Sequence, residues 1–84
     1  MAKRYTAALI HYNNAMALNP NDHTLYSNEA LVWYHLKQFE KALASAEKCI
    51  ELNPDFAKGY FRKGKILEEL KRLDEAVAAY KEVK

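Results

Sequence analysis

The sequence predicts an all-α fold in which about five antiparallel helices form helix-turn-helix repeats that stack into a right-handed solenoid. The first observation is a repeat, because Leu18-Asn19-Pro20-Asn21 returns 34 residues later as Leu52-Asn53-Pro54-Asp55. The second is that apolar residues recur at helical spacing on both sides of each proline, without the alternation typical of strands. A fixed period of this length indicates an array of units, each of which buries its apolar face against the next.

The first two helices are predicted over residues 3–18 and 22–37, on either side of Pro20. A residue that precedes proline disfavours the helical conformation, so the first helix should end before Pro20. Asn21 or Asp22 can then accept a backbone N–H at the start of the second helix.

Three further helices are predicted over residues 39–52, 56–71 and 74–83. Lys37-Gln38 forms the short turn before the first of them, and Asn53-Pro54-Asp55 separates the first from the second. Two acidic residues open the last helix, where the positive end of the helix dipole favours them. Because short connections make sequential helices antiparallel, the second and fourth helices should lie side by side and line a groove.

The repeat boundaries divide a single domain, residues 1–84, into three parts. Residues 1–20 form a half repeat that has the second helix only, residues 21–54 form a complete repeat, and residues 55–84 form a final repeat truncated at its end. In this phase the first helix presents an apolar stripe toward a missing groove helix, and Val77 and Tyr80 on the last helix are uncovered. The stripe consists of Tyr5, Leu9, Tyr12 and Met16. Uncovered apolar ends favour self-association into a homo-oligomer.

Composition argues against several classes of protein. The formal net charge of +2 is too small to indicate nucleic acid as a partner. No apolar run approaches the roughly 20 residues that a membrane span needs. The N-terminus lacks the apolar core of a signal peptide, and Cys49 is the single cysteine, so we expect a reducing, cytoplasmic location.

No catalytic or metal-binding constellation is visible, so we expect neither enzyme activity nor a cofactor nor a metal site. The chain has no Gly-rich phosphate loop and no nucleophile with a base in register. His23 and His35 are 12 residues apart, which separates them by about 120° around a helix. Cys49 shares its repeat position with Ala15 and Val83, so we predict a small buried side chain there.

A cationic cluster marks the start of the fourth helix. Lys58, Arg62, Lys63 and Lys65 lie within eight residues, and no acid separates them. The first, second and fourth of these share one helical face, because they are spaced by four and three residues. On an arbitrary helix such a cluster is usually a solvated face, and that alternative remains open.

The second helix offers neutral partners at Thr24, Asn28 and Leu31, which also share one face. Parallel groove helices would place Asn28 near Arg62. A guanidinium presents a fork of donors, an ammonium a point charge and an amide a neutral donor. Together they suit a doubly charged target, such as a terminal carboxylate beside an aspartate side chain. Phe61 can add an apolar wall for a valine side chain.

The packing positions resemble the tetratricopeptide repeat pattern over essentially the whole chain. These positions are Tyr26, Ala30, Trp33, Ala42 and Pro54, then Tyr60, Gly64, Leu67, Ala76 and Tyr80. Residues 23–28 and 55–63 are similar to segments of the co-chaperones that dock on heat-shock chaperones. The resemblance implies a protein-interaction module whose groove holds the Glu-Glu-Val-Asp tail of a cytosolic chaperone.

The same resemblance implies a carboxylate clamp of five residues, of which Asn28, Lys58 and Arg62 match three. The other two, a Lys and an Asn, belong to a groove helix that precedes the first helix in the family. Glu29 departs from the pattern, because a basic residue is common beside the clamp Asn. We therefore predict a partner protein or peptide with an acidic C-terminus. The predicted contacts are Asn28, Lys58, Arg62, Lys65, Phe61, Thr24 and Leu31. The alternative is a structural repeat scaffold that assembles with itself or with other subunits and has no such ligand.

Overall fold

The computed structural model describes residues 2–83 and is built of helices joined by short turns. The helices are α1 (Ala2–Leu18), α2 (His23–His35), α3 (Phe39–Leu52), α4 (Ala57–Glu69) and α5 (Leu73–Lys81). No strand occurs within the described range, and the predicted all-α class is confirmed. The predicted limits of α3 are exact, whereas α2 and α4 each end two residues earlier than the apolar periodicity indicated.

Two lysines in left-handed backbone conformation explain these early ends. Lys37 has a φ of 62° and Lys71, one repeat later, has a φ of 63°. A residue with a side chain adopts this conformation at a cost of roughly 1–2 kcal/mol, so it needs support from the turn. The support is a backbone bond from the N–H of Gln38 to the carbonyl of Trp33 at 2.9 Å, which the second turn repeats at the same distance. Each turn thereby satisfies a free carbonyl at the end of its helix.

The two groove helices start differently. Asp22, one of the two caps that the sequence predicted, caps α2 by accepting the backbone N–H of Thr24 at 3.0 Å. Phe56 takes the equivalent position before α4 and makes no side-chain cap. Its ring packs edge-on against His23, with centroids 4.6 Å apart, and so joins the start of α4 to the start of α2.

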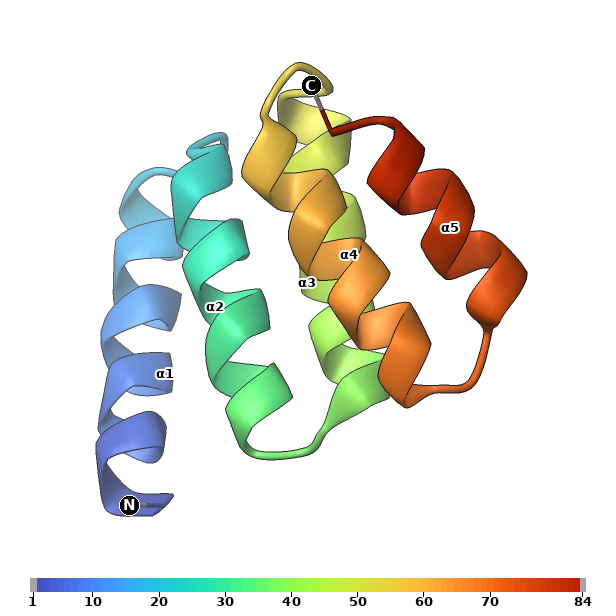
Figure 1. Ribbon diagram of the computed structural model, residues 1–84. Coiled ribbons are helices and arrows are strands. Elements are labelled where there is room, and N and C mark those ends of the chain that lie inside the picture. Colours follow the sequence, from blue (N-terminus) through green and yellow to red (C-terminus); the bar gives the residue numbers. More distant parts are fainter. Residues whose placement is uncertain (1, 84) are drawn as a thin grey trace.

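The helices follow one another across the molecule as two antiparallel hairpins, α2–α3 and α4–α5, with α1 packed against α2 (Figure 1). In this view α3 lies behind α4 and beside α2, and it contacts both of them. α2 and α4 also touch each other on the near face, so the two helices predicted to line the groove are neighbours.

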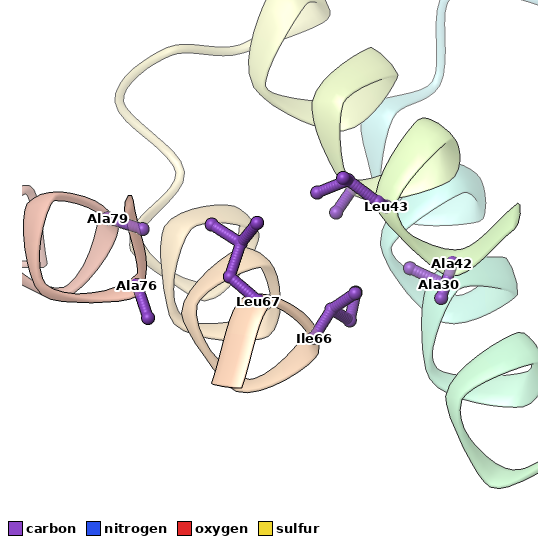
Figure 2. Packing of buried hydrophobic residues seen from close by; sticks show 8 residues of the cluster. Ala30, Ala42, Leu43, Ile66, Leu67, Ala76 and Ala79 are labelled. Carbon is purple, nitrogen blue, oxygen red and sulfur yellow. The ribbon is translucent and has the colours of Figure 1, made fainter. Parts of the chain in front are cut away.

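The buried core joins α2, α3, α4 and α5. It consists of Ala30, Ala42, Leu43, Ala46, Ile66, Leu67, Ala76 and Ala79. Figure 2 shows Ile66 and Leu67 of α4 between the residues of the α2–α3 hairpin and the alanines of α5. Small residues let the helices approach closely: a Cβ added at Gly64 would lie 2.6 Å from a ring carbon of Tyr80. The α4–α5 packing therefore requires a residue without a side chain at this position.

Tyr5 of the apolar stripe on α1 contacts α2, which corrects the expectation that this side chain faces a missing helix. Tyr5 stacks on His35 of α2 with centroids 5.6 Å apart and planes 11° from parallel. Leu9, Tyr12 and Met16 are half-buried. The large apolar side chains of α1 that are exposed lie elsewhere, at Ile10 and Leu18.

Candidate functional site

A small apolar pocket lies between α2 and α4, on the face where these helices touch. Its volume is about 70 Å³, and its lining comes from Ala30, Leu31, Tyr34, Phe61, Arg62, Lys65 and Ile66. Four of the seven residues predicted to bind a peptide therefore meet here: Leu31 from α2, and Phe61, Arg62 and Lys65 from α4. Helical spacings of three and four residues put the α4 members on one face.

Arg62 is anchored across the groove by a serine. Its Nε donates a hydrogen bond to Oγ of Ser27 on α2 at 2.7 Å, and Ser27 is only 2% exposed. Burial lowers the pKa of the Arg62 guanidinium from its ordinary value, while nearby Cys49 and Tyr12 oppose the change. An arginine keeps its charge at neutral pH despite such a shift. Within residues 2–83, neither Nη of Arg62 has a hydrogen-bond partner.

Lys65 and Phe61 form a cationic and apolar rim beside Arg62. The Nζ of Lys65 lies 5.9 Å from the centroid of the Phe61 ring, close enough for a cation–π contact. Phe61 is 49% exposed, and Leu31 across the groove is 37% exposed. The site thus combines large apolar side chains open to solvent with a positive charge that no acid among the described residues neutralises.

Three predicted residues lie outside the pocket, toward the N-terminal ends of the groove helices. Thr24 is occupied by the α2 cap, because its hydroxyl donates to Asp22 Oδ1 at 2.5 Å. Asn28 is half-buried and Lys58 is exposed, one helical turn before the pocket. The side chains of Asn28 and Lys58 form no hydrogen bond or ion pair with the rest of the described chain. Arg62 bonds Ser27, the residue before Asn28, and the predicted proximity of Asn28 itself to Arg62 stays a prediction.

Two other charged residues near the cluster point away from the groove. Lys63, which belongs to the cationic cluster by sequence, pairs with Glu47 of α3 at 3.5 Å. Glu29, which stands where a basic residue is common, accepts a hydrogen bond from the Ser45 hydroxyl of α3 at 2.7 Å. Its carboxylate is therefore directed into the α2–α3 hairpin and does not oppose the cations of α4.

The far end of the groove is acidic and aromatic, and sequence reasoning did not include its tyrosine among the binding residues. Tyr34 lines the pocket and donates its hydroxyl to Glu69 at 3.3 Å. Burial, and then the charge of Glu69, raises the pKa of Tyr34. Tyr80 donates to Glu68 in the same way, and burial together with that bond raises the pKa of Tyr80 to about 12. Tyr34 lies three residues after Leu31 and therefore on the same face of α2, so this spacing could have predicted that Tyr34 lines the pocket.

Ser27 was also missed. It is a small polar residue one position before Asn28, and nothing in its local sequence distinguishes it from an ordinary helix residue. Ser27 and Arg62 are 35 residues apart, which is one repeat plus one position. Residues at this separation lie on adjacent groove helices, and that relation was the only sequence signal that could have predicted the contact.

The remaining groups that carry chemistry are dispersed or buried. His23 contacts Asn53 at 3.2 Å, and His35 stacks on Tyr5, so these two imidazoles belong to separate clusters. Residues 2–83 contain no group of three or more His, Cys, Asp or Glu side chains that could hold a metal ion. Cys49 is fully buried, as predicted, and burial raises the pKa of its thiol. Across the described helices, none has the length and apolar character to cross a membrane.

Sequence comparison places the chain among known repeat proteins. Models of the tetratricopeptide repeat match residues 24–56 and residues 45–78. The Hsp70-Hsp90 organizing protein 3 of Arabidopsis thaliana is 45% identical over 80 residues. That match covers 95% of this chain and 14% of the relative, so the chain spans about one seventh of the relative's length.

Solved structures share the fold. The first TPR of Spaghetti (RPAP3), bound to the HSP90 peptide SRMEEVD, matches with a TM-score of 0.93 at 30% identity, over 96% of this chain and 64% of that one. The TPR domain of Arabidopsis OM64 matches with a TM-score of 0.91 at 31% identity, over 96% of this chain and 67% of that one. The 34-residue period, the paired hairpins and these matches agree: the chain belongs to the tetratricopeptide repeat family.

Proposed function

We propose that this chain is a peptide-binding module that captures the acidic C-terminal tail of a heat-shock chaperone in the groove between α2 and α4. The observation that carries the proposal is that the basic side chains on one face of α4 are not paired with acids. Lys58, Arg62 and Lys65 share one face and have no acidic partner among the described residues, and Arg62 and Lys65 border an apolar pocket. The similar Spaghetti domain is bound to an HSP90 peptide that ends in Glu-Glu-Val-Asp, which supports a ligand of this chemistry.

In the proposed complex the clamp consists of Asn28, Lys58 and Arg62. The two basic side chains take the terminal carboxylate and the aspartate side chain through charge-assisted hydrogen bonds, and the amide of Asn28 adds a neutral donor. The tail would run with its C-terminus toward the start of α4, where the helix dipole also favours negative charge. The apolar pocket beside Phe61 would take an apolar side chain of the tail.

The remaining predicted contacts have supporting roles in this proposal. Lys65 adds positive charge for the glutamates that precede the terminus, and Leu31 lies on the opposite wall of the pocket. Thr24 contributes by holding the start of α2 in place, since its hydroxyl is occupied by Asp22. We place the activity in the cytoplasm, where a buried free thiol such as Cys49 stays reduced.

The test is a calorimetric titration with the peptide Ser-Arg-Met-Glu-Glu-Val-Asp in two forms, one with a free C-terminal acid and one amidated. Three of five clamp positions should give the free acid a Kd of about 10 μM or weaker, and amidation should weaken binding about tenfold or more. A scrambled free-acid peptide of the same composition is the control. Equal affinity for the free acid and the amide would remove the carboxylate clamp.

The second candidate is a structural scaffold that self-associates, and exposed apolar residues at both ends of the array favour it. Leu73 and Val77 on α5 are 59% and 53% exposed, and Ile10 and Leu18 on α1 are 56% and 82% exposed. Light scattering over a hundredfold range of protein concentration separates the candidates. A mass that rises with concentration, and that Val77→Glu returns to the monomer value, would support assembly through α5. A constant monomer mass would remove this candidate.

A further inference from the structure

We infer that Ser27 is a positioning residue for the groove: it orients the Arg62 guanidinium so that only its Nη edge faces a bound carboxylate. The inference rests on the proposed function, because it assigns the part that Ser27 plays in the same site. Ser27 is 2% exposed, lies on α2, and accepts the Nε hydrogen bond of Arg62 from α4 at 2.7 Å.

The chemistry follows from the guanidinium fork. Arginine can meet a carboxylate in two ways, either side-on through Nε and one Nη, or end-on through both Nη groups. The bond to Ser27 uses Nε, and the described residues give the two Nη groups no partner. An incoming carboxylate therefore meets the end-on edge.

Burial makes this arrangement persistent. The hydroxyl of Ser27 is shielded from water, and Arg62 is itself only partly exposed. An arginine that is already held in one rotamer loses less conformational freedom when it binds a ligand. Ser27 would thus raise affinity without touching the peptide.

The repeat pattern explains why the serine–arginine hydrogen bond joins the first hairpin to the second and has no equivalent one repeat later. Phe61 occupies the position one repeat after Ser27, so the serine is particular to the first hairpin and the arginine to the second. The bond joins neighbouring repeats, and it orients a binding residue in one through a buried side chain in the other.

Ser27→Ala should weaken binding of the free-acid peptide Ser-Arg-Met-Glu-Glu-Val-Asp by about three- to tenfold, through the ordering cost that the serine removes. Affinity for the amidated peptide should change little. Ser27→Thr, which retains a hydroxyl, should restore most of the loss. The matched control is Ser45→Ala, because Ser45 is the other buried serine and its hydroxyl bonds Glu29 on the side away from the groove.

A double-mutant cycle separates positioning from general destabilisation. In an Arg62→Lys background, which has no Nε at that position, Ser27→Ala should have no further effect on free-acid binding. An equal loss in both backgrounds, or a loss that Ser45→Ala reproduces, would overturn the inference.

A measurement without peptide distinguishes failure of this inference from failure of the proposed function. The Arg62 Nε–H signal in NMR should exchange slowly with water in the wild type and about tenfold faster in Ser27→Ala. Fast exchange in the wild type overturns the inference even if the clamp binds the free acid. Equal wild-type affinity for the free-acid and amidated peptides overturns both the proposed function and the role of Ser27 in binding. If the Arg62 Nε–H still exchanges slowly in that case, the Ser27–Arg62 hydrogen bond exists but has only a structural role.

Discussion

The two hairpins share a sequence pattern but differ in how deeply they are buried. Leu43 of α3 is 7% exposed, whereas Val77, one repeat later in α5, is 53% exposed. The turns that start these helices are alike, with a left-handed lysine in each. The difference lies in the neighbours: α3 packs against both α2 and α4, whereas α5 packs against α4 alone among the described helices. In a repeat array the pattern specifies the helix, and the adjacent repeat determines what is buried.

The groove helices differ in chemistry at matching positions. The pairs are Thr24 and Lys58, Asn28 and Arg62, and Leu31 and Lys65. The first hairpin contributes neutral groups, and the second contributes the charges. Packing positions, by contrast, keep their character, as the buried pair Ala42 and Ala76 does. A binding site can therefore vary along an array while the frame of helices stays the same.

The largest effect expected from this comparison is on stability. Leu43→Ala should lower the free energy of unfolding by about 2–4 kcal/mol, since it leaves a cavity between α3 and its two neighbours. Val77→Ala, at the matching exposed position, should cost less than about 0.5 kcal/mol. Urea denaturation measures the two losses, and an unchanged m-value shows that the change is in stability. Similar losses at the two positions would show that another surface covers α5 in solution.

The next effect concerns the charged side of the groove. Arg62→Ala and Lys58→Ala should each weaken binding of the free-acid peptide by about 1.5–3 kcal/mol, because each removes a charge-assisted hydrogen bond. Lys63→Ala is the matched control, since this lysine pairs with Glu47 on the side of α3. Calorimetry at two salt concentrations should also show weaker binding at high salt. A loss for Lys63→Ala as large as that for Arg62→Ala would mean that net charge, and not the clamp, attracts the peptide.

A third effect tests overpacking in the two hairpins. Ala42→Phe should cost about 2–3 kcal/mol, because Ala42 has no exposed surface between α2 and α3. Ala76→Phe should cost about 1 kcal/mol, because α5 has a neighbour on one side only and can move outward. The measurement is the fall in melting temperature of each variant relative to the wild type. Equal costs would show that α5 is held as firmly as α3.

The smallest effect is a difference in acid sensitivity between the starts of α2 and α4. The hydrogen bonds from Thr24 hold the pKa of the Asp22 carboxyl below its ordinary value. A depressed folded-state pKa gives stability that is present above the unfolded-state pKa, and this stability is lost as the pH falls below about 4. The protection of backbone amides against hydrogen exchange, relative to their intrinsic exchange rate at each pH, should therefore fall at the start of α2 in this range. Asp22→Asn, which caps without titrating, should remove that acid response. A response that survives in Asp22→Asn would assign it to another group.

Much of the fold could be predicted because a 34-residue period constrains every helix at once. The helix ends were less accurate, since Lys37 and Lys71 take a conformation that Gly or Asn usually marks at a helix terminus. The orientation of the first helix was wrong for Tyr5, because a stripe of apolar residues shows which face is buried and not which neighbour buries it.

The candidate site could be predicted as a face but not as a set of contacts. The spacing of Lys58, Arg62 and Lys65 put them together on α4, and Arg62 and Lys65 line the pocket with Phe61 and Leu31. The bond between Arg62 and Ser27 depends on how two repeats stack, and no local pattern encodes it. The direction of Glu29 could not be predicted either, since it depends on the serine that α3 presents.

In the proposed complex the α2–α4 groove holds a peptide by its C-terminal carboxylate. The most direct test is an NMR titration of the ¹⁵N-labelled chain with the free-acid and amidated forms of Ser-Arg-Met-Glu-Glu-Val-Asp. The free acid should shift the side-chain signals of Asn28 and Arg62 and the backbone signals of α4 near Lys58, and the amide should shift them much less. Shifts of equal size with both peptides, or shifts centred on Leu73 and Val77 of α5, would contradict the proposed complex.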